Sequence, residues 1–250
     1  MIRALFALPS FVVATLLGSV MAWFFGIIDR TGDLVLALAR LWSRVVLGVP
    51  GVKLEVVTHA PLDPKRPYVF MANHASMVDI WAMFVSVPVS FRFIAKKQLA
   101  RIPFFGWAMM AGRFIFIDRQ NAASARRSIE EAARRIQGGQ SVVIYPEGTR
   151  TRDGRVAPFK KGGFHLAMNS GADIVPVAII GSRAVMPRGA ALIQAGTVKV
   201  EFGVPIPTTN ITNGERNALV DRVRDTIIAM LGDPPDPAGS ATARAETGRA

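Results

Sequence analysis

The sequence contains no cysteine in its 250 residues. This absence excludes a disulfide-stapled scaffold, a cysteine nucleophile and a thiolate metal site, and it is compatible with a protein that faces the cytosol. Charged residues are also sparse, at 19%, whereas half of the residues are hydrophobic. So much apolar material can offset the entropy cost of folding, which excludes a disordered protein, and the length fits a single domain.

Acidic residues are scarce as well: 18 Asp and Glu face 30 Lys and Arg, a formal net charge of +12. The segment from Lys96 to Lys161 alone holds 14 basic and five acidic residues. A chain that is both apolar and basic suits nucleic acid or an anionic membrane with its phosphorylated lipids. Nucleic-acid binding favours aromatic residues interleaved with basic ones. Here the aromatic residues cluster in apolar runs and only two are tyrosine, so we expect no nucleic-acid partner.

The N-terminal 50 residues hold the longest apolar run. Ala4 to Ile28 contains no ionisable side chain, and a helix of that length rises about 37 Å against a hydrocarbon core of roughly 30 Å. A spanning anchor fits this run. A helix within one leaflet also fits, because Pro9, Gly18 and Gly26 interrupt it. We do not expect a cleaved signal peptide, because the run is too long and no clear cleavage site follows it.

A second apolar segment, Leu34 to Val49, has a narrow polar stripe formed by Asp33, Ala37, Arg40 and Arg44. This pattern favours an interfacial helix whose arginines reach the lipid headgroups. The alternative is an ordinary pair of core helices. We expect residues 1–50 to be a membrane-anchoring helical pair, although the few flanking charges do not set its orientation.

After Pro50, short β-branched or aromatic runs alternate with helical stretches. Strands are predicted at Lys53–Val57, Tyr68–Ala72, Phe91–Ala95, Phe114–Ile117, Val142–Tyr145, Ile174–Ile179 and Val198–Phe202. Helices are predicted at Val78–Val87, Leu99–Ala111, Ala122–Gln137, Gly162–Asn169 and Asn213–Leu231. The alternation predicts an α/β domain over residues 51–231, with a mixed, largely buried β-sheet flanked by helices. Residues 232–250 are rich in Pro, Ala and Gly, which predicts a disordered tail.

The strongest catalytic candidate is the pair His74 and Asp79. His74 follows a buried strand and precedes a helix, a common place for a catalytic group in α/β folds. The two side chains meet only if His74 lies on the turn and Asp79 on the first helical turn. Asp79 could then hold the imidazole and leave its other nitrogen as a general base. Ser76 is a better helix cap than a nucleophile. The alternative is a capping Asp beside an incidental His.

Two further segments combine strand ends with charge. Tyr145 to Arg150 offers a glycine for an unusual turn, and Thr149 and Arg150 as donors for an oxyanion or phosphate. Gly112 to Arg119 is a strand that delivers Asp118 and Arg119 at its end. Each segment alone could be a solvated loop. We see no cluster of metal ligands.

Together these motifs resemble one family. The order NHxxxxD (Asn73–Asp79), FIDR (Phe116–Arg119), PEGTR (Pro146–Arg150) and IVPVA (Ile174–Ala178) closely resembles the glycerolipid acyltransferase family over about residues 52–230. The sequence departs from the family pattern in small ways: Tyr145 replaces the usual Phe, Thr151 replaces the usual Ser, and Arg113 intrudes into the second motif.

The resemblance implies transfer of a fatty acyl group from acyl-CoA or acyl carrier protein to the sn-2 hydroxyl of 1-acyl-glycerol-3-phosphate, giving phosphatidic acid. His74 would be the base and Asp79 its partner, with no acyl-enzyme, no cofactor and no metal. The implied acceptor-binding residues are Arg119, Glu147, Gly148, Thr149 and Arg150. Lys96, Lys97, Lys160 and Lys161 are further candidates for phosphate contacts, and Pro176 would shape the acyl or thioester side.

Several alternatives stay open at this point. The acceptor could be another lysolipid, such as lyso-ornithine lipid, or glycerol 3-phosphate, and a non-catalytic basic membrane- or nucleic-acid-binding module is the distant alternative. The apolar run Ile102–Met110 could line an acyl groove or form a buried helix. A lysophospholipid acceptor also fits the apolar N-terminus, and we expect the protein at the cytoplasmic face of the inner membrane, bound to membrane lipids.

Overall fold

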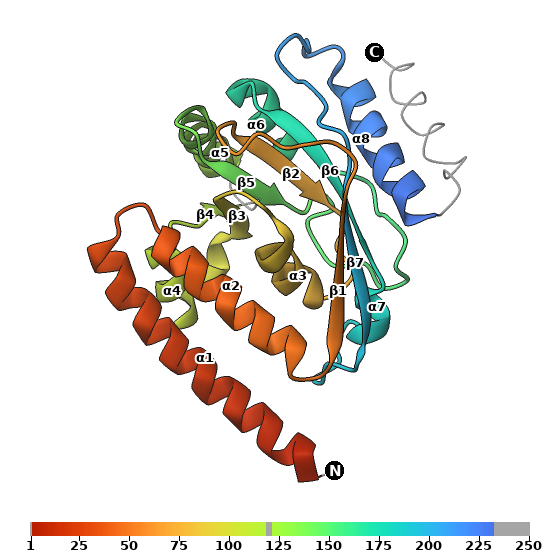
Figure 1. The fold of residues 1–250 in the computed structure, drawn as a ribbon. Helices are drawn as coiled ribbons and strands as arrows, with labels where there is room; N and C mark the ends of the chain where they lie inside the picture. Colours follow the sequence, from red (N-terminus) through yellow and green to blue (C-terminus); the bar gives the residue numbers. More distant parts are fainter. Residues whose placement is uncertain (1, 119–121, 233–250) are drawn as a thin grey trace.

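The computed structural model describes residues 2–118 and 122–232 (Figure 1). The strands are β1 (Val52–Thr58), β2 (Tyr68–Ala72), β3 (Phe91–Lys96), β4 (Ile115–Ile117), β5 (Ser141–Ile144), β6 (Asp173–Ile180) and β7 (Gly196–Phe202). The helices are α1 (Ile2–Ile28), α2 (Asp33–Gly48), α3 (Val78–Ser86), the 3₁₀ helix η1 (Lys97–Arg101), α4 (Phe105–Ala111), α5 (Ala122–Gln137), α6 (Gly162–Ser170), α7 (Ser182–Val185) and α8 (Arg216–Leu231).

The strands form one mixed sheet in the order β1-β7-β6-β2-β5-β3-β4. The five strands from β6 to β4 are parallel, whereas β7 runs antiparallel to β6 and pairs in parallel with β1. All five residues of β2 are buried, as expected of a central strand covered on both faces. The predicted mixed α/β fold with a largely buried sheet is therefore confirmed.

Helices cover both faces of the sheet (Figure 1). Phe70 and Ala72 of β2 point into a core that they share with α2, α3 and α7. Val69 and Met71 point the other way, into a core that includes residues of α5, α6 and α8. This alternation follows from the two-residue period of a strand. Because helices cover both faces, the ends of the strands are the places open to function. We call these ends, where the parallel strands begin and where they end, the two edges of the sheet.

The N-terminal helices are part of this structure. Leu36 and Leu47 of α2 lie in the core that also holds α3, while α1 packs against α4. Along the described part of α1 only Ser19 and Ala22 are buried, and large apolar side chains such as Phe24 and Ile28 are exposed. Within the part of the chain that the structure describes, we find no helix with both the length and the apolar character needed to cross a membrane.

Within the polar stripe of α2, Arg40 contacts the protein, whereas Asp33, Ala37 and Arg44 are exposed. Nη2 of Arg40 donates hydrogen bonds to the carbonyls of Val87 and Val89, at 2.8 and 2.7 Å. Oδ1 of Asp33 accepts one from Ser90. The expectation that Arg40 reaches outward is therefore wrong. A helical stripe shows which residues share a face, but it does not show what covers that face.

Three other predictions need correction. The helix expected over Leu99–Ala111 is divided into η1 and α4, because Pro103 lacks an N–H and Phe104 adopts φ +62°. It is not a buried helix, since only Gly106 and Met109 of α4 are buried. The last helix begins at Arg216, and α7 was not expected. The predicted tail, apart from Gly232, lies outside the described residues, as does Arg119.

Candidate active site

His74 and Asp79 meet at the edge where the parallel strands end. His74 lies on the turn between β2 and α3, and Asp79 is the second residue of α3. Nδ1 of His74 is 2.7 Å from Oδ2 of Asp79. This is the arrangement that the spacing required, with the histidine on the turn and the aspartate on the first helical turn. The contact itself was therefore expected, and the catalytic role stays a prediction.

The carboxylate of Asp79 is held from several sides. Asp79 is completely buried, and its Oδ2 also accepts hydrogen bonds from the backbone N–H groups of Ala75 and Ser76, both at 2.8 Å. Because a carboxylate only accepts, Nδ1 of His74 is the donor and Nε2 is the acceptor nitrogen of the neutral ring. Asp79 therefore orients the imidazole and assigns its proton, which leaves Nε2 for chemistry.

Two aromatic side chains form a wall behind the histidine. The ring of Tyr145 stacks on His74 with centroids 4.0 Å apart and an interplanar angle of 17°. The ring of Phe93 in turn stacks on Tyr145, with the two ring centroids 6.0 Å apart. Burial raises the pKa of Tyr145 well above its ordinary value, and the charge of Asp79 adds to that effect. Tyr145 therefore stays neutral and serves as a flat surface against the imidazole.

The loop after β5 clamps the backbone of His74 on both sides. One oxygen of Glu147 accepts the N–H of His74 at 2.6 Å, and the other accepts the N–H of Ala157 at 2.9 Å. The N–H of Thr151 donates to the carbonyl of His74 at 2.9 Å. Glu147 is only 3% exposed. The resemblance implied that Glu147 contacts the acceptor, but the structure places it beneath the histidine with both oxygens engaged by the backbone.

Glu147 is also the carboxyl group at this edge that titrates near neutrality. Its pKa is raised to about 7. Burial is the main cause and the charge of Asp79 adds to it, whereas the N–H groups of Ala157 and His74 and the charge of Arg224 oppose the rise. The clamp is therefore partly protonated in the physiological range. Below that range the protonated carboxyl loses acceptor strength toward these two amides.

The polar candidates of the PEGTR segment lie on the surface turn beside this clamp. Gly148 adopts φ +78°, where a glycine avoids the Cβ clash of other residues. Thr149 is exposed and Arg150 is half-buried. The carbonyl of Arg150 accepts a hydrogen bond from Arg188 at 2.8 Å, which fixes the turn to the segment after α7.

The candidate lysines gather at the same edge. Lys96 is the last residue of β3 and is exposed. The backbone N–H of Lys160 donates to the carbonyl of Pro146 at 2.9 Å, so the exposed Lys160 returns to the PEGTR loop. Lys161 is exposed next to it, and Nζ of Lys97 pairs with Asp118 at 3.4 Å. Arg119, the next residue after Asp118, lies outside the described residues.

Pro176 and Asn73 occupy structural positions within the sheet. Pro176 is buried in β6 opposite Met71, and its carbonyl accepts the N–H of Gly203 at 2.8 Å. Asn73, to which the sequence analysis gave no role, exchanges two hydrogen bonds with the backbone of Ile179, at 3.1 and 2.7 Å. Its side chain thereby extends the pairing of β2 and β6 and positions the turn that carries His74. The signal for this role was a polar residue directly after a fully buried strand.

The described residues also limit other chemistries. They contain no cluster of three or more His, Asp or Glu side chains that could hold a metal ion. Ser76 is fully buried, accepts the N–H of Val78 at 3.1 Å and donates to the carbonyl of Met186 at 2.7 Å. The hydroxyl therefore closes the turn before α3. The N-cap of α3 is Met77, without a side-chain capping hydrogen bond, so the expected cap at Ser76 is not confirmed. His59 lies at the opposite edge, where it pairs with Glu201.

A family model described as Acyltransferase matches residues 53–180. The chain is 32% identical over 196 residues to 1-acyl-sn-glycerol-3-phosphate acyltransferase from Limnanthes douglasii, covering 78% of this chain and 68% of that protein. It is 32% identical over 195 residues to the alpha enzyme of that name from Homo sapiens, covering 78% and 69%. Its match to the Chlamydomonas reinhardtii enzyme, 31% over 205 residues, covers 81% of this chain but only 59% of that protein.

The fold has a solved counterpart. The crystal structure of the 1-acyl-sn-glycerophosphate acyltransferase PlsC from Thermotoga maritima superimposes with a TM-score of 0.71 at 24% identity, covering 92% of this chain and 95% of that one. At this identity the likeness supports the fold, including its N-terminal helices. The family match covers the sheet edge that carries His74, Asp79 and the PEGTR loop. This chain belongs to the acyltransferase family.

Proposed function

We propose that the protein transfers a fatty acyl group from a thioester to the sn-2 hydroxyl of 1-acyl-glycerol-3-phosphate, giving phosphatidic acid. The observation that carries the proposal is the His74–Asp79 contact, clamped by the PEGTR loop at the carboxyl ends of the parallel strands. The relatives named as 1-acyl-sn-glycerol-3-phosphate acyltransferases support this acceptor. The alternatives are another lysolipid, such as lyso-ornithine lipid, and glycerol 3-phosphate.

The geometry supports a direct transfer. Nε2 of His74 takes the proton of the acceptor hydroxyl while its oxygen attacks the thioester carbonyl. Asp79 stabilises the imidazolium that forms, as the acidic partner does in a catalytic triad. The tetrahedral intermediate then collapses, the C–S bond breaks, and His74 returns the proton to the leaving thiolate. No acyl-enzyme is needed, which agrees with Ser76 being buried and donating its hydroxyl to the carbonyl of Met186. The donor would be acyl-CoA or the thioester of acyl carrier protein, and no cofactor or metal takes part.

The basic residues around the clamp would bind the acceptor phosphate. Arg150 and Arg119 offer the forked donors that suit a phosphate group. Gly148, Thr149, Lys96 and Lys160 complete the set, and Pro176 supports the neighbouring strand. In place of an acceptor contact, we assign Glu147 the support of His74, because both of its oxygens already accept backbone N–H groups.

The apolar surface of α1 and α4 would place the protein in one leaflet. Phe24 and Ile28 of α1 are 57% and 75% exposed, and Trp107 of α4 is 46% exposed. Contiguous exposed apolar surface of this kind marks an interaction site. We assign it to the cytoplasmic face of the inner membrane, where thioester donors are found. Phe24→Glu/Ile28→Glu should strongly reduce sedimentation with anionic vesicles. Unchanged sedimentation would contradict this placement.

The decisive test of the activity is acyl transfer by the full-length protein in mixed micelles with oleoyl-CoA and 1-oleoyl-glycerol-3-phosphate. His74→Ala should lower turnover by about 10²–10⁴-fold while the fold survives, because a positioned general base contributes that much. His59→Ala is the matched control, since His59 lies at the other sheet edge, and should retain turnover. Normal turnover in His74→Ala would overturn the mechanism. A lack of transfer to this acceptor, with transfer to lyso-ornithine lipid, would establish that alternative.

The phosphate assignment has its own test. Arg150→Ala should raise KM for 1-oleoyl-glycerol-3-phosphate far more than for the uncharged 1-oleoylglycerol. Arg126→Ala removes an exposed arginine from α5 as a control for net charge. Equal losses with both acceptors would show that Arg150 does not bind the phosphate.

A further inference from the structure

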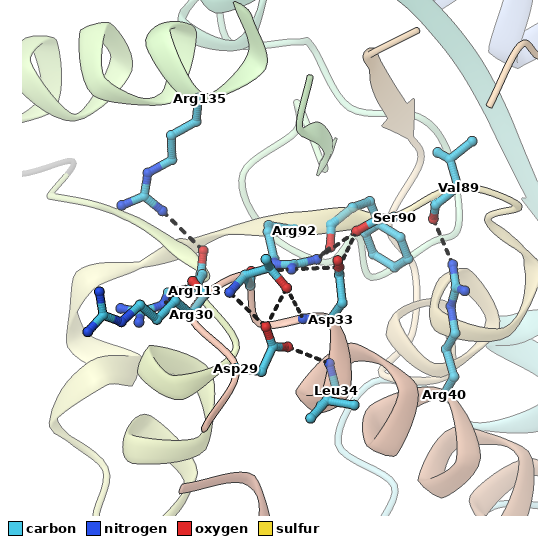
Figure 2. A network of polar contacts seen from close by, with 12 residues as sticks. Asp29, Arg30, Asp33, Leu34, Arg40, Val89, Ser90, Arg92, Arg113 and Arg135 are labelled. Carbon is cyan, nitrogen blue, oxygen red and sulfur yellow. Dashed lines mark hydrogen bonds and ion pairs between the residues drawn. The ribbon is translucent and has the colours of Figure 1, made fainter. Parts of the chain in front are cut away.

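A basic cavity lies at the edge of the sheet opposite His74, where the parallel strands begin. It has a volume of about 630 Å³, and its lining includes Arg30, Arg92, Arg113, Arg135 and Asp33. These residues come from the α1–α2 turn, the start of β3, the α4–β4 turn and the end of α5 (Figure 2). A five-residue strand such as β2 separates the two edges by roughly 17 Å. The cavity is therefore distinct from the site at His74.

Arg92 is the buried centre of this cavity. It is 2% exposed, and its Nη2 donates to the carbonyl of Thr31 at 2.6 Å and to Oδ1 of Asp33 at 3.0 Å. Its Nε is buried and has no hydrogen-bond partner among the described residues. A buried guanidinium N–H without a partner is costly. Four arginines line the cavity against Asp33, with Asp29 beside it, so positive charge is in excess and an anion is the complementary ligand.

Arg113 is held in an unusual conformation that aims it at this edge. Its φ of +59° is rare for a residue with a side chain and is a strained backbone conformation. Its Nε donates to the carbonyl of Arg30 at 3.2 Å, and its own carbonyl accepts a hydrogen bond from Arg135 at 3.2 Å (Figure 2). Arg113 is the residue that intrudes into the second family motif, and acyl transfer at His74 gives it no task.

An apolar groove adjoins the cavity through Arg113. The groove has a volume of about 580 Å³ between α1 and α4, and its lining includes Val20, Trp23, Phe104, Trp107 and Arg113. Arg113 thus lines both spaces. An apolar channel that ends in a cluster of guanidinium groups matches one kind of molecule, an amphiphile with a hydrocarbon chain and an anionic head.

We propose that the groove and the cavity together bind an anionic phospholipid of the surrounding leaflet, separate from the substrate. One acyl chain would lie between α1 and α4, and the headgroup phosphate would face Arg30, Arg113 and Arg135, with the charge of the buried Arg92 beneath them. The bound lipid would seal the seam between the N-terminal helices and the catalytic domain. The proposal does not depend on acyl transfer, because its ligand is not consumed.

The test uses full-length protein in phosphatidylcholine vesicles that contain a trace of photoactivatable phosphatidylglycerol with the reactive group in its acyl chain. Illumination followed by peptide mapping should place the label on α1 and α4. Arg30→Ala/Arg113→Gly should reduce this labelling by roughly tenfold, since each charge-assisted hydrogen bond contributes more than 1 kcal/mol. Glycine is chosen at 113 because it adopts φ +59° without strain. Arg126→Ala/Arg222→Ala removes two exposed charges elsewhere and should label normally.

Three results would overturn the proposal. Equal labelling by photoactivatable phosphatidylcholine would mean that the helices merely contact bulk lipid. Unchanged labelling in the double variant with a normal thermal unfolding midpoint would remove the arginines from the site. Suppression of the labelling by millimolar inorganic phosphate would identify free phosphate as the ligand. Labelling that depends on headgroup charge and on Arg30 and Arg113, and that survives in His74→Ala, would establish a lipid site independent of the catalytic one.

Discussion

The two edges of the sheet are built from opposite chemistry. At the edge near His74, carboxylates collect backbone N–H groups: Asp79 accepts from Ala75 and Ser76, and Glu147 from His74 and Ala157. At the other edge, arginines donate hydrogen bonds to backbone carbonyls. Arg40 donates to two carbonyls of the α3–β3 turn, and Arg92 donates to one carbonyl of β3 and one of the α1–α2 turn. Arg113 donates to a carbonyl of the α1–α2 turn, and Arg135 to one of the α4–β4 turn.

The difference shows how each edge can use its charge. A carboxylate that accepts several amide hydrogen bonds is fixed in place, and Asp79 thereby orients a base without facing the substrate. A guanidinium carries five N–H donors, so an arginine can bind a carbonyl and still present donors to a ligand. One edge is therefore suited to holding a base in position and the other to attracting an anion.

The largest effect is expected at the carboxylate edge. Asp79→Asn keeps an oxygen for the N–H groups of Ala75 and Ser76 but removes the charge that stabilises the imidazolium. Turnover should fall by about 10²–10⁴-fold with little change in the thermal unfolding midpoint. Steady-state acyl transfer measures it, and Asp153→Asn on an exposed loop is the control. Turnover within a factor of two of the native rate would show that Asp79 only caps α3.

Glu147 should make stability depend on pH. Burial raises its pKa from 4.5 to about 7, so the folded protein favours the protonated form. This contribution to the free energy of unfolding is fully present below about pH 4.5 and is lost as the pH rises through about 7. It amounts to up to roughly 3 kcal/mol.

Urea unfolding between pH 5 and pH 8 measures this loss, and Glu147→Gln should flatten the dependence. The exposed Glu130→Gln on α5 should leave it unchanged. If the free energy of unfolding of Glu147→Gln still depended on pH as in the native protein, the pH dependence would belong to another group. The contrast between the two edges would then be contradicted.

The arginine edge should lose stability when its buried member is replaced. Arg92→Met keeps much of the length of the side chain but removes its donations to Phe91, Thr31 and Asp33. We expect a loss of roughly 2 kcal/mol in the free energy of unfolding by urea. Arg126→Met, at a side chain 84% exposed, should change it little. Equal stability of the two variants would mean that Arg92 does not organise this edge.

The smallest effect concerns the seam between α1 and α4. A Cβ at Gly26 would lie 2.5 Å from the Cβ of Ala111, whereas a Cβ at Gly18 would meet nothing within 4 Å. Gly26→Ala should therefore destabilise the protein by about 1–2 kcal/mol, and Gly18→Ala should be neutral or slightly stabilising. Thermal unfolding in detergent measures both. Adding Ala111→Gly should restore Gly26→Ala only in part, because the Cα of residue 111 would still lie 2.9 Å from the added Cβ. The absence of any rescue would argue against close packing at the seam.

Most of the fold could be predicted from the sequence, because buried strands are short apolar runs bounded by turn residues. The predicted Tyr68–Ala72 matches β2, and the other strands differ from their predictions by one or two residues at one or both ends. The contact of His74 with Asp79 could also be predicted, since only one backbone arrangement lets residues at that spacing meet. Local patterning sufficed wherever the partners were close in the sequence.

Features that depend on distant partners could not be predicted. Arg40 donates to carbonyls 47 and 49 residues away, and Glu147 is buried by its contact with a turn 73 residues earlier. In neither case does the sequence around the residue indicate its distant partner. The break before α4 was partly visible at Pro103, but nothing in the local sequence indicates the positive φ of Phe104.

The attachment of α1 and α2 to the rest of the protein has a consequence for catalysis at a bilayer. Gly26 approaches Ala111, Gly32 approaches Gly112, and Leu36 and Leu47 share the core with α3. The apolar surface is thus a rigid mount rather than a flexible tether. Under the proposed placement, the fold fixes the distance between His74 and the lipid surface. A lipid substrate must therefore move toward His74, because His74 cannot move toward the bilayer.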